Sequence, residues 1–147
     1  SFKPVVHHND IFQTIAAAGK ADIPKDRKLD GFNFLPFVKG EKNGKIHQTI
    51  FWRQGHQQTV LNNGWKLIRT NNENQKWLFN LNEDPTEKNN LVKNYPDKVN
   101  FLDSLLNDHN SDQLESMWPS VVNSPILIDK HFGEEYEEGD EYIYWPN

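Results

Sequence analysis

The dipeptide Asn63-Gly64 is the feature that most constrains what this chain can fold into. Both residues tolerate the positive φ angles that a two-residue type I′ hairpin loop requires, so the dipeptide predicts a β-hairpin. The loop also fixes the register of the two strands, because pairing is counted outward from the turn. The expected pairs are Asn62 with Trp65, Leu61 with Lys66, Val60 with Leu67, and Thr59 with Ile68.

Apolar runs on both sides of this hairpin predict two more strands. Residues Thr49 to Arg53 are β-branched and aromatic, Gly55 separates them from the strand that starts near Gln57, and Lys76 to Asn80 form the last run. A small sheet needs a covering layer on its apolar face. The predicted fold class is therefore α+β: a four-stranded antiparallel sheet covered by helices, with an irregular C-terminal tail.

Two helices with one apolar side are predicted to supply that cover. The stronger one opens at Pro96 and either continues through Leu114 to Met117 or breaks near Asn110. Its apolar stripe consists of Val99, Leu102, Leu105 and Leu106. The other spans Asn9 to Gly19, with Gly19 suited to end it. It places Ile11, Ile15 and Ala18 on one side, with Phe12 beside them.

Two shorter helical turns are also predicted. Asp84-Pro85-Thr86-Glu87 has the parts of a helix start, and we expect that turn to end near Asn90. An irregular stretch between Lys20 and Gly40 contains apolar residues that we expect to be buried around a second short turn. These are Phe32, Phe34, Leu35 and Phe37.

Composition limits the possible partners. The 147 residues fit a single domain, and the absence of cysteine excludes disulfides, thiolate zinc sites and a cysteine nucleophile. Glu134 to Glu141 contain six acids and no base, so the rest of the chain is close to neutral. Neither nucleic acid nor membrane is expected as a partner, since no basic stripe and no long apolar run is present. The acidic run is interpreted as a solvated tail; docking on a basic surface and weak cation binding are the alternatives.

A polar turn between two apolar strands is the main candidate for a binding site. Arg53, Gln54 and His56 are predicted to project at the rim of the sheet, where a guanidinium and an imidazole could bind an anion. A solvent-facing hairpin is the alternative. Lys66 and Arg69 are interpreted as a solvated strand face or as ligand contacts.

The remaining histidines and the tryptophans are given structural roles. Adjacent His7 and His8 diverge in a strand or helix, so one of them is expected to hydrogen-bond near the helix start rather than to share a metal. The other histidines singled out, His47, His109 and His131, are expected at the surface. The set Trp52, Trp65 and Trp77 is assigned to the core, with a sugar-stacking platform as the alternative.

The sequence contains no recognisable set of catalytic residues. A positioned acid or base contributes about 10²- to 10⁴-fold, whereas enzymes reach 10⁶-fold or more. The chain has no Gly-rich phosphate loop, no Gly-x-Ser-x-Gly and no His-Glu-x-x-His. On its own residues, therefore, the chain is not identifiable as an enzyme.

Several segments, taken in order, resemble the C-terminal part of a sulfatase of the arylsulfatase type, in the alkaline phosphatase superfamily. They are HHNDIFQTIAAAG, PKDRKLDGFNFLPFVKG, and the most specific pair, GWKLIR followed by LFNLNEDPTEKNNL. Gln13 departs from the family, where a proline is common. The resemblance divides the chain into a sulfatase C-terminal subdomain over 1–118, with a small sheet plus helices, and an extended acidic and aromatic tail over 119–147.

The resemblance implies a hydrolase of sulfate esters in which a small C-terminal subdomain closes one side of the substrate cleft. In that family the nucleophile is a formylglycine made in a Cys/Ser-x-Pro-x-Arg motif, and calcium or magnesium binds the sulfate. This chain has no position that matches either, so no catalytic and no metal residue is assigned and the chain alone is expected to be inactive. Arg53, Gln54 and His56 become candidates for lining the cleft.

The implied partners are an N-terminal sulfatase domain and a sulfate ester substrate; self-association is also expected because apolar faces lack a cover. The family favours a periplasmic or extracellular location. A stand-alone binding or protein-interaction module with a sulfatase-like C-terminal fold is the competing interpretation.

Overall fold

The computed structural model describes residues 2–70, 74–114, 117–118, 123–127, 134–135 and 137–146. The chain forms two units, Ser1–Gln48 and Thr49–Asn147, and the boundary lies directly before the first strand. The division into 1–118 and 119–147 stays a prediction.

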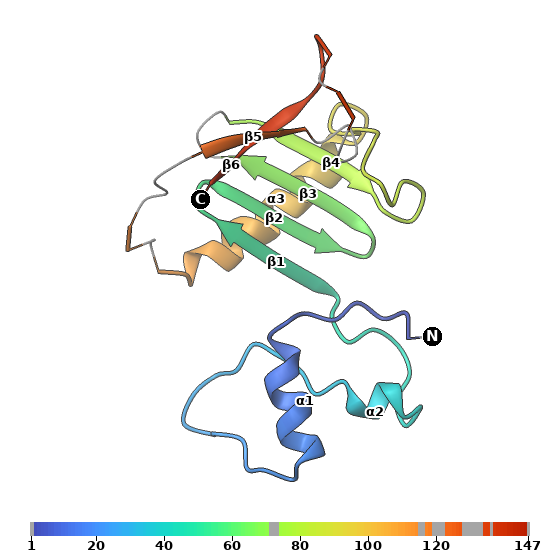
Figure 1. Ribbon diagram of the computed structural model, residues 1–147, viewed down its shortest axis with the longest axis vertical. Helices are drawn as coiled ribbons and strands as arrows, with labels where there is room; N and C mark the ends of the chain where they lie inside the picture. Colours follow the sequence, from blue (N-terminus) through green and yellow to red (C-terminus); the bar gives the residue numbers. More distant parts are fainter. Residues whose placement is uncertain are drawn as a thin grey trace. The chain divides into compact units, whose positions relative to one another are not determined.

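The second unit is built on the predicted hairpin. Strands β1 (Thr49–Gln54), β2 (Gln57–Asn62), β3 (Trp65–Thr70) and β4 (Lys76–Asn80) form one antiparallel sheet in the order β1-β2-β3-β4 (Figure 1). Asn63 and Gly64 have φ angles of 51° and 85°, as a type I′ loop requires. All four predicted pairs of β2 with β3 are present, so the turn chemistry alone gave the register.

Helix α3 (Pro96–Ser111) covers one face of this sheet and forms the main core. Its buried residues Val99, Leu102 and Leu106 cluster with a row of sheet residues, one from each of three strands. These are Val60, Leu67 and Leu78, which also pair with one another across β2, β3 and β4. The predicted fold class is confirmed.

Of the two predicted ends of this helix, the break near Asn110 is confirmed and the continuation through Leu114 to Met117 is wrong. The helix ends at Ser111, and the Leu114 and Met117 side chains are 92% and 84% exposed. The apolar stripe stops after Leu106, because the next positions on that face are Asn110 and Gln113. Without apolar burial, nothing holds another turn against the sheet.

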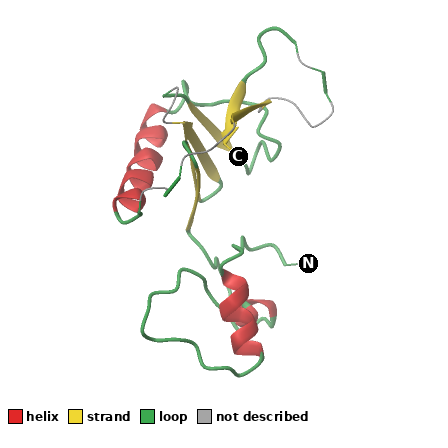
Figure 2. Ribbon diagram, turned by 60° about the vertical axis from the view of Figure 1, so that its left-hand side comes forward, coloured by secondary structure: helices red, strands yellow, loops and turns green. Residues whose placement is uncertain are grey.

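The opposite face of the sheet is also buried, around Ile68, Trp77 and Phe79. Figure 2 shows α3 on one side of the sheet and the pair β5 (Asn123–Leu127) and β6 (Tyr142–Pro146) on the other. These two strands are antiparallel. The tail that the sequence predicted as irregular thus contains two strands; Pro125 and Pro146 lie within them, and proline obscures a strand pattern.

The segment Asp84–Asn90 is a turn and not the predicted helix. Asp84 does accept hydrogen bonds, from the backbone N–H of Asn89 at 2.8 Å and from the Thr86 hydroxyl at 3.3 Å. Glu87, however, has a positive φ of 59° and bonds the Lys66 ammonium through both carboxylate oxygens, at 2.7 and 2.8 Å. A left-handed residue at this position stops a helix from continuing.

The first unit contains α1 (Asp10–Ala18) and the short α2 (Leu35–Val38). Both were predicted, but the expected burial around α2 is wrong. Phe32 is 55% exposed, and Phe34, Leu35 and Phe37 are only partly buried. The positive φ after α1 belongs to Lys20, at 55°, and not to Gly19.

Candidate functional site

The three predicted rim residues lie around the β1–β2 turn, but they do not share one face. Arg53 and Gln54 are the last residues of β1, and successive strand residues point to opposite faces. Arg53 is on the α3 side and donates to the Leu114 carbonyl at 3.3 Å; it is partly buried, as is His56, whereas Gln54 is exposed. Strand alternation therefore separates Arg53 from Gln54, and all three remain candidates.

Arg53 belongs to a polar row that crosses the whole sheet. Arg53 pairs with Gln58, Gln58 with Arg69, and Arg69 with Lys76. The row faces α3, where Asp103 accepts from Arg69 Nη1 at 2.7 Å and from Lys76 Nζ at 2.9 Å. The carboxylate thus compensates two cations of the row between the sheet and the helix.

Amide side chains complete this polar row. Arg69 Nε donates to Gln58 Oε1 at 2.7 Å, and its Nη1 donates to Asn107 Oδ1 at 2.8 Å. Asn110 Nδ2 donates to the same Gln58 oxygen at 2.9 Å. Arg69 therefore links the sheet to α3 by hydrogen bonds and an ion pair. The interpretation of Arg69 as part of a solvated face is wrong. Local spacing could not reveal this, because the helix partners of Arg69, Asp103 and Asn107, are 34 and 38 residues away.

The row gives a pH-dependent contribution to stability. Burial alone raises the pKa of Asp103, but hydrogen bonds and charges from Lys76 and Arg69 bring it below the usual value of 3.8. A depressed folded-state pKa means that the ionised group stabilises the fold above pH 3.8, and that this contribution is lost as pH falls through the lower folded value.

We therefore expect Asp103→Asn to lower the free energy of unfolding at neutral pH by an amount that shrinks below pH 3.8. Urea unfolding followed by tryptophan fluorescence measures this difference, since every tryptophan lies in the second unit. Asp108→Asn, on the same helix, is the matched control. A difference for Asp103→Asn that stays constant into strong acid would contradict the assignment.

The three tryptophans, assigned to the core with a sugar-stacking platform as the alternative, lie in different environments. Trp77 is 4% exposed and belongs to the core, as predicted. Trp65 is partly buried against the α3 core and meets Tyr95 edge-on, with ring centroids 5.1 Å apart. Trp52 is 42% exposed on the strand next to the rim turn, so it is not a core residue. No common stacking platform is formed by the three.

Among the histidines, the predicted surface position of His47 is wrong. It was expected at the surface, yet its side chain is 8% exposed and its Nε2 lies 2.7 Å from Asp10 Oδ2. His109 stacks on Phe51, with ring centroids 4.1 Å apart and an interplanar angle of 2°. His131 lies outside the described residues.

Asp10 is the centre of the first unit. Its side chain is fully buried and accepts from the backbone N–H of His7 at 2.7 Å and of Phe32 at 2.8 Å, besides meeting His47. Burial raises the pKa of Asp10, but hydrogen bonds from His7, His47 and Phe32 outweigh it and keep the pKa below the usual value. The expectation that His7 or His8 hydrogen-bonds near the helix start is confirmed for His7: its backbone N–H donates to Asp10, and its Nδ1 accepts from the Asn9 N–H at 3.4 Å.

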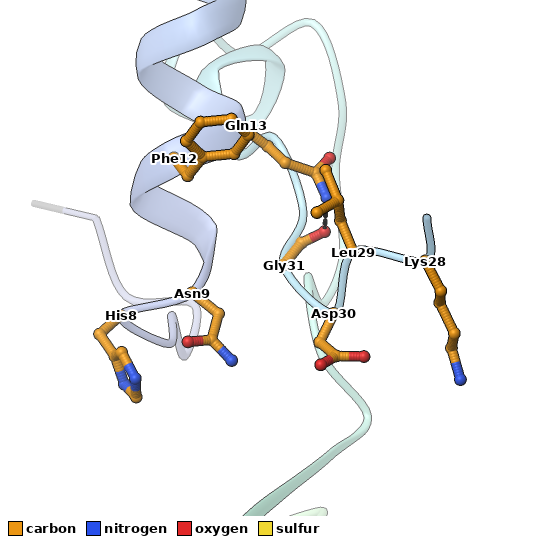
Figure 3. A pocket seen from close by; sticks show the side chains of 8 residues that line it. All are labelled: His8, Asn9, Phe12, Gln13, Lys28, Leu29, Asp30 and Gly31. Carbon is orange, nitrogen blue, oxygen red and sulfur yellow. Dashed lines mark hydrogen bonds between the residues drawn. The ribbon is translucent and has the colours of Figure 1, made fainter. Parts of the chain in front are cut away.

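A pocket of about 420 Å³ opens beside the start of α1 (Figure 3). One side comes from the helix start and the other from an irregular segment about 20 residues later. Its lining is His8, Asn9, Phe12, Gln13, Lys28, Leu29, Asp30 and Gly31. The lining thus combines one cation, one carboxylate, two amides and one aromatic ring, and the Gln13 amide already donates to the Gly31 carbonyl. Sequence reasoning missed this pocket because Lys28 to Gly31 carry no periodic signal.

The described residues do not suit the calcium or magnesium that the resemblance implies. Within the described ranges, no group of three His, Asp or Glu side chains could hold a metal ion. The Asp10 oxygens already accept from N–H donors, which a hard cation would have to displace. None of the described helices is long and apolar enough to cross a membrane.

The chain is similar in sequence to sulfatases. It is 24% identical over 146 residues to an uncharacterized sulfatase, YdeN, of Escherichia coli K12, covering 74% of this chain and 26% of that protein. It is 26% identical over 111 residues to an N-acetylgalactosamine-6-O-sulfatase of Bacteroides thetaiotaomicron, covering 66% of this chain and 22% of that protein. No family model matches.

The fold agrees with these similarities. A solved structure from a study of glycosaminoglycan metabolism by Bacteroides thetaiotaomicron is 26% identical, with a TM-score of 0.55, covering 69% of this chain and 24% of that one. The chain spans about a quarter of the length of the curated relatives that it matches. It is accordingly a sulfatase-related segment that corresponds to part of a sulfatase chain.

Proposed function

We propose that this chain acts as the C-terminal part of a hydrolase of sulfate esters. In this proposal it closes one side of the substrate cleft, while the formylglycine nucleophile and the calcium or magnesium ion come from an N-terminal sulfatase domain. The name of one relative suggests sulfated amino sugars as the first substrates to test.

The observation that carries the proposal is the combination of sulfatase similarity with a missing reactive group. The similarity covers a quarter of each curated relative, and the chain has neither a cysteine nor a serine in a Ser-x-Pro-x-Arg context. The sheet and α3 nevertheless pack around one apolar core, as a rigid wall should. The residues thus support a positioning role and provide no nucleophile.

The gene tests the proposal. We expect the reading frame upstream of Ser1 to encode a Cys/Ser-x-Pro-x-Arg motif in a sulfatase domain. A start codon directly before Ser1 would instead support the competing class, a stand-alone binding module.

The rim residues give a kinetic test of the cleft. In the enzyme reconstituted with its N-terminal domain, Arg53→Ala should raise KM for a sulfated sugar about tenfold, the loss of one charge-assisted hydrogen bond, with kcat little changed. Lys88→Ala is the matched control, since Lys88 is an exposed cation of the same unit that lies outside the three rim residues. Steady-state kinetics separates the two. Equal effects of both substitutions, or no effect of either, would remove Arg53 from the cleft.

A further inference from the structure

Helix α1 is arranged with its polar residues inside. Its buried side chains are Asp10 and Thr14, whereas Ile11, Phe12 and Ile15 are 52%, 55% and 66% exposed. Helices of globular proteins normally turn their apolar stripe toward the core. We call Ile11, Phe12 and Ile15 the α1 apolar face; in the first unit this face has no core to meet.

The polar side of α1 is fixed in place by the chain segment that follows it. Asp10 accepts from the Phe32 N–H at 2.8 Å, the Thr14 hydroxyl accepts from the Phe34 N–H at 3.1 Å, and Gln13 donates to the Gly31 carbonyl. A Cβ added at Gly31 would collide with the backbone of Asn9. The segment is therefore packed too closely for α1 to rotate its apolar face inward.

No apolar side chain of the first unit is buried among its described residues. The buried residues there are Asp10, Thr14 and Gly31, and every buried apolar residue identified belongs to the second unit. Apolar burial is the main favourable term in folding, and it contributes roughly 1.5 to 3 kcal/mol per large side chain. The exposed aliphatic and aromatic residues here make a patch that marks an interaction surface in soluble proteins.

We infer that the α1 apolar face is an interface that packs against the part of a sulfatase outside the matched quarter. This inference rests on the proposed function, because the relatives supply the missing partner: the match covers 26% and 22% of their lengths, so 74% and 78% lie outside it. A second copy of this chain is a less suitable partner for the α1 apolar face. A stable dimer buries about 800 Å² on each partner, more than three half-exposed side chains provide, whereas contacts between domains of one chain are often smaller.

The test mixes the purified 147-residue chain with the separately expressed polypeptide encoded upstream of Ser1, and measures hydrogen exchange of the α1 amides by mass spectrometry. We expect the upstream polypeptide to slow this exchange at least about tenfold, because covering the face stabilises the helix against local opening. The double substitution Ile11→Asn with Ile15→Asn should abolish the slowing. Phe101→Asn is the matched control, since Phe101 is an exposed apolar residue of α3 and should leave the slowing unchanged.

The possible results separate the interface, a second copy of the chain and the proposed function. Equal slowing in the double variant would overturn the interface while leaving the proposed function intact. Protection of α1 that rises with the concentration of the chain alone, and is lost in the double variant, would overturn it in favour of a second copy. A reading frame without a sulfatase domain upstream would overturn the proposed function, and the partner with it. Unchanged α3 exchange in the double variant confirms that the second unit is still folded.

Discussion

Leu102→Ala is expected to lower the free energy of unfolding of the second unit by about 3 kcal/mol, within the range of roughly 2 to 5 kcal/mol for such core truncations. Leu102 is fully buried between α3 and the sheet, in the cluster that includes Val60 and Leu67. Removing its methyl groups leaves a cavity that the β-sheet cannot close by moving, because its strands are held in register. Urea unfolding followed by tryptophan emission measures the loss.

Phe101→Ala provides the control on the same helix. Phe101 is 47% exposed and loses more carbon atoms than Leu102 does, so size alone would predict the larger effect there. Burial predicts the reverse, with a change of less than about 1 kcal/mol for Phe101→Ala. Similar losses for both substitutions would mean that α3 does not form the core with the sheet.

Asp10→Ala is expected to produce the largest change in the first unit. It leaves the buried His47 and the N–H groups of His7 and Phe32 without their common acceptor, at a cost of about 1 to 3 kcal/mol for each unsatisfied group. A unit with no buried apolar side chain among its described residues has little to offset this. We expect exchange of the α1 amides to rise at least about tenfold, measured by hydrogen exchange with the α3 amides as an internal reference.

Asp22→Ala serves as the control for that substitution, since Asp22 is an exposed acid of the same unit. It should leave α1 exchange unchanged. If Asp10→Ala also leaves it unchanged, the buried carboxylate does not hold the unit together.

The second unit was predictable from sequence because its signals are local. The Asn63-Gly64 dipeptide gave both the hairpin and the register, and the stripe from Val99 to Leu106 gave the helix and its buried face. Both depend on residues a few positions apart. The end of α3 was left open between Asn110 and Met117, because Leu114 and Met117 continue the composition of the helix after its apolar stripe has stopped.

The polar contacts were not predictable in the same way. His47 was expected at the surface, and no local pattern connects it with Asp10, 37 residues earlier. Arg69 and Asp103 are likewise 34 residues apart. A charged residue gives the same sequence signal whether it faces solvent or a buried partner, so only the fold distinguishes the two. The apolar side of α1 was expected to help cover the sheet, and this is wrong, since Ile11, Phe12 and Ile15 are 52%, 55% and 66% exposed. A helix pattern does not say whether its cover lies within the same chain.

Turnover of a sulfate ester tests the central claim most directly. The purified 147-residue chain, assayed with calcium and with both an aryl sulfate and N-acetylgalactosamine 6-O-sulfate, should show no activity above background, and activity should appear when the upstream polypeptide is added. The reason is that the nucleophile is expected in that polypeptide and the wall of the cleft in this one. Turnover by the 147-residue chain alone would contradict this account.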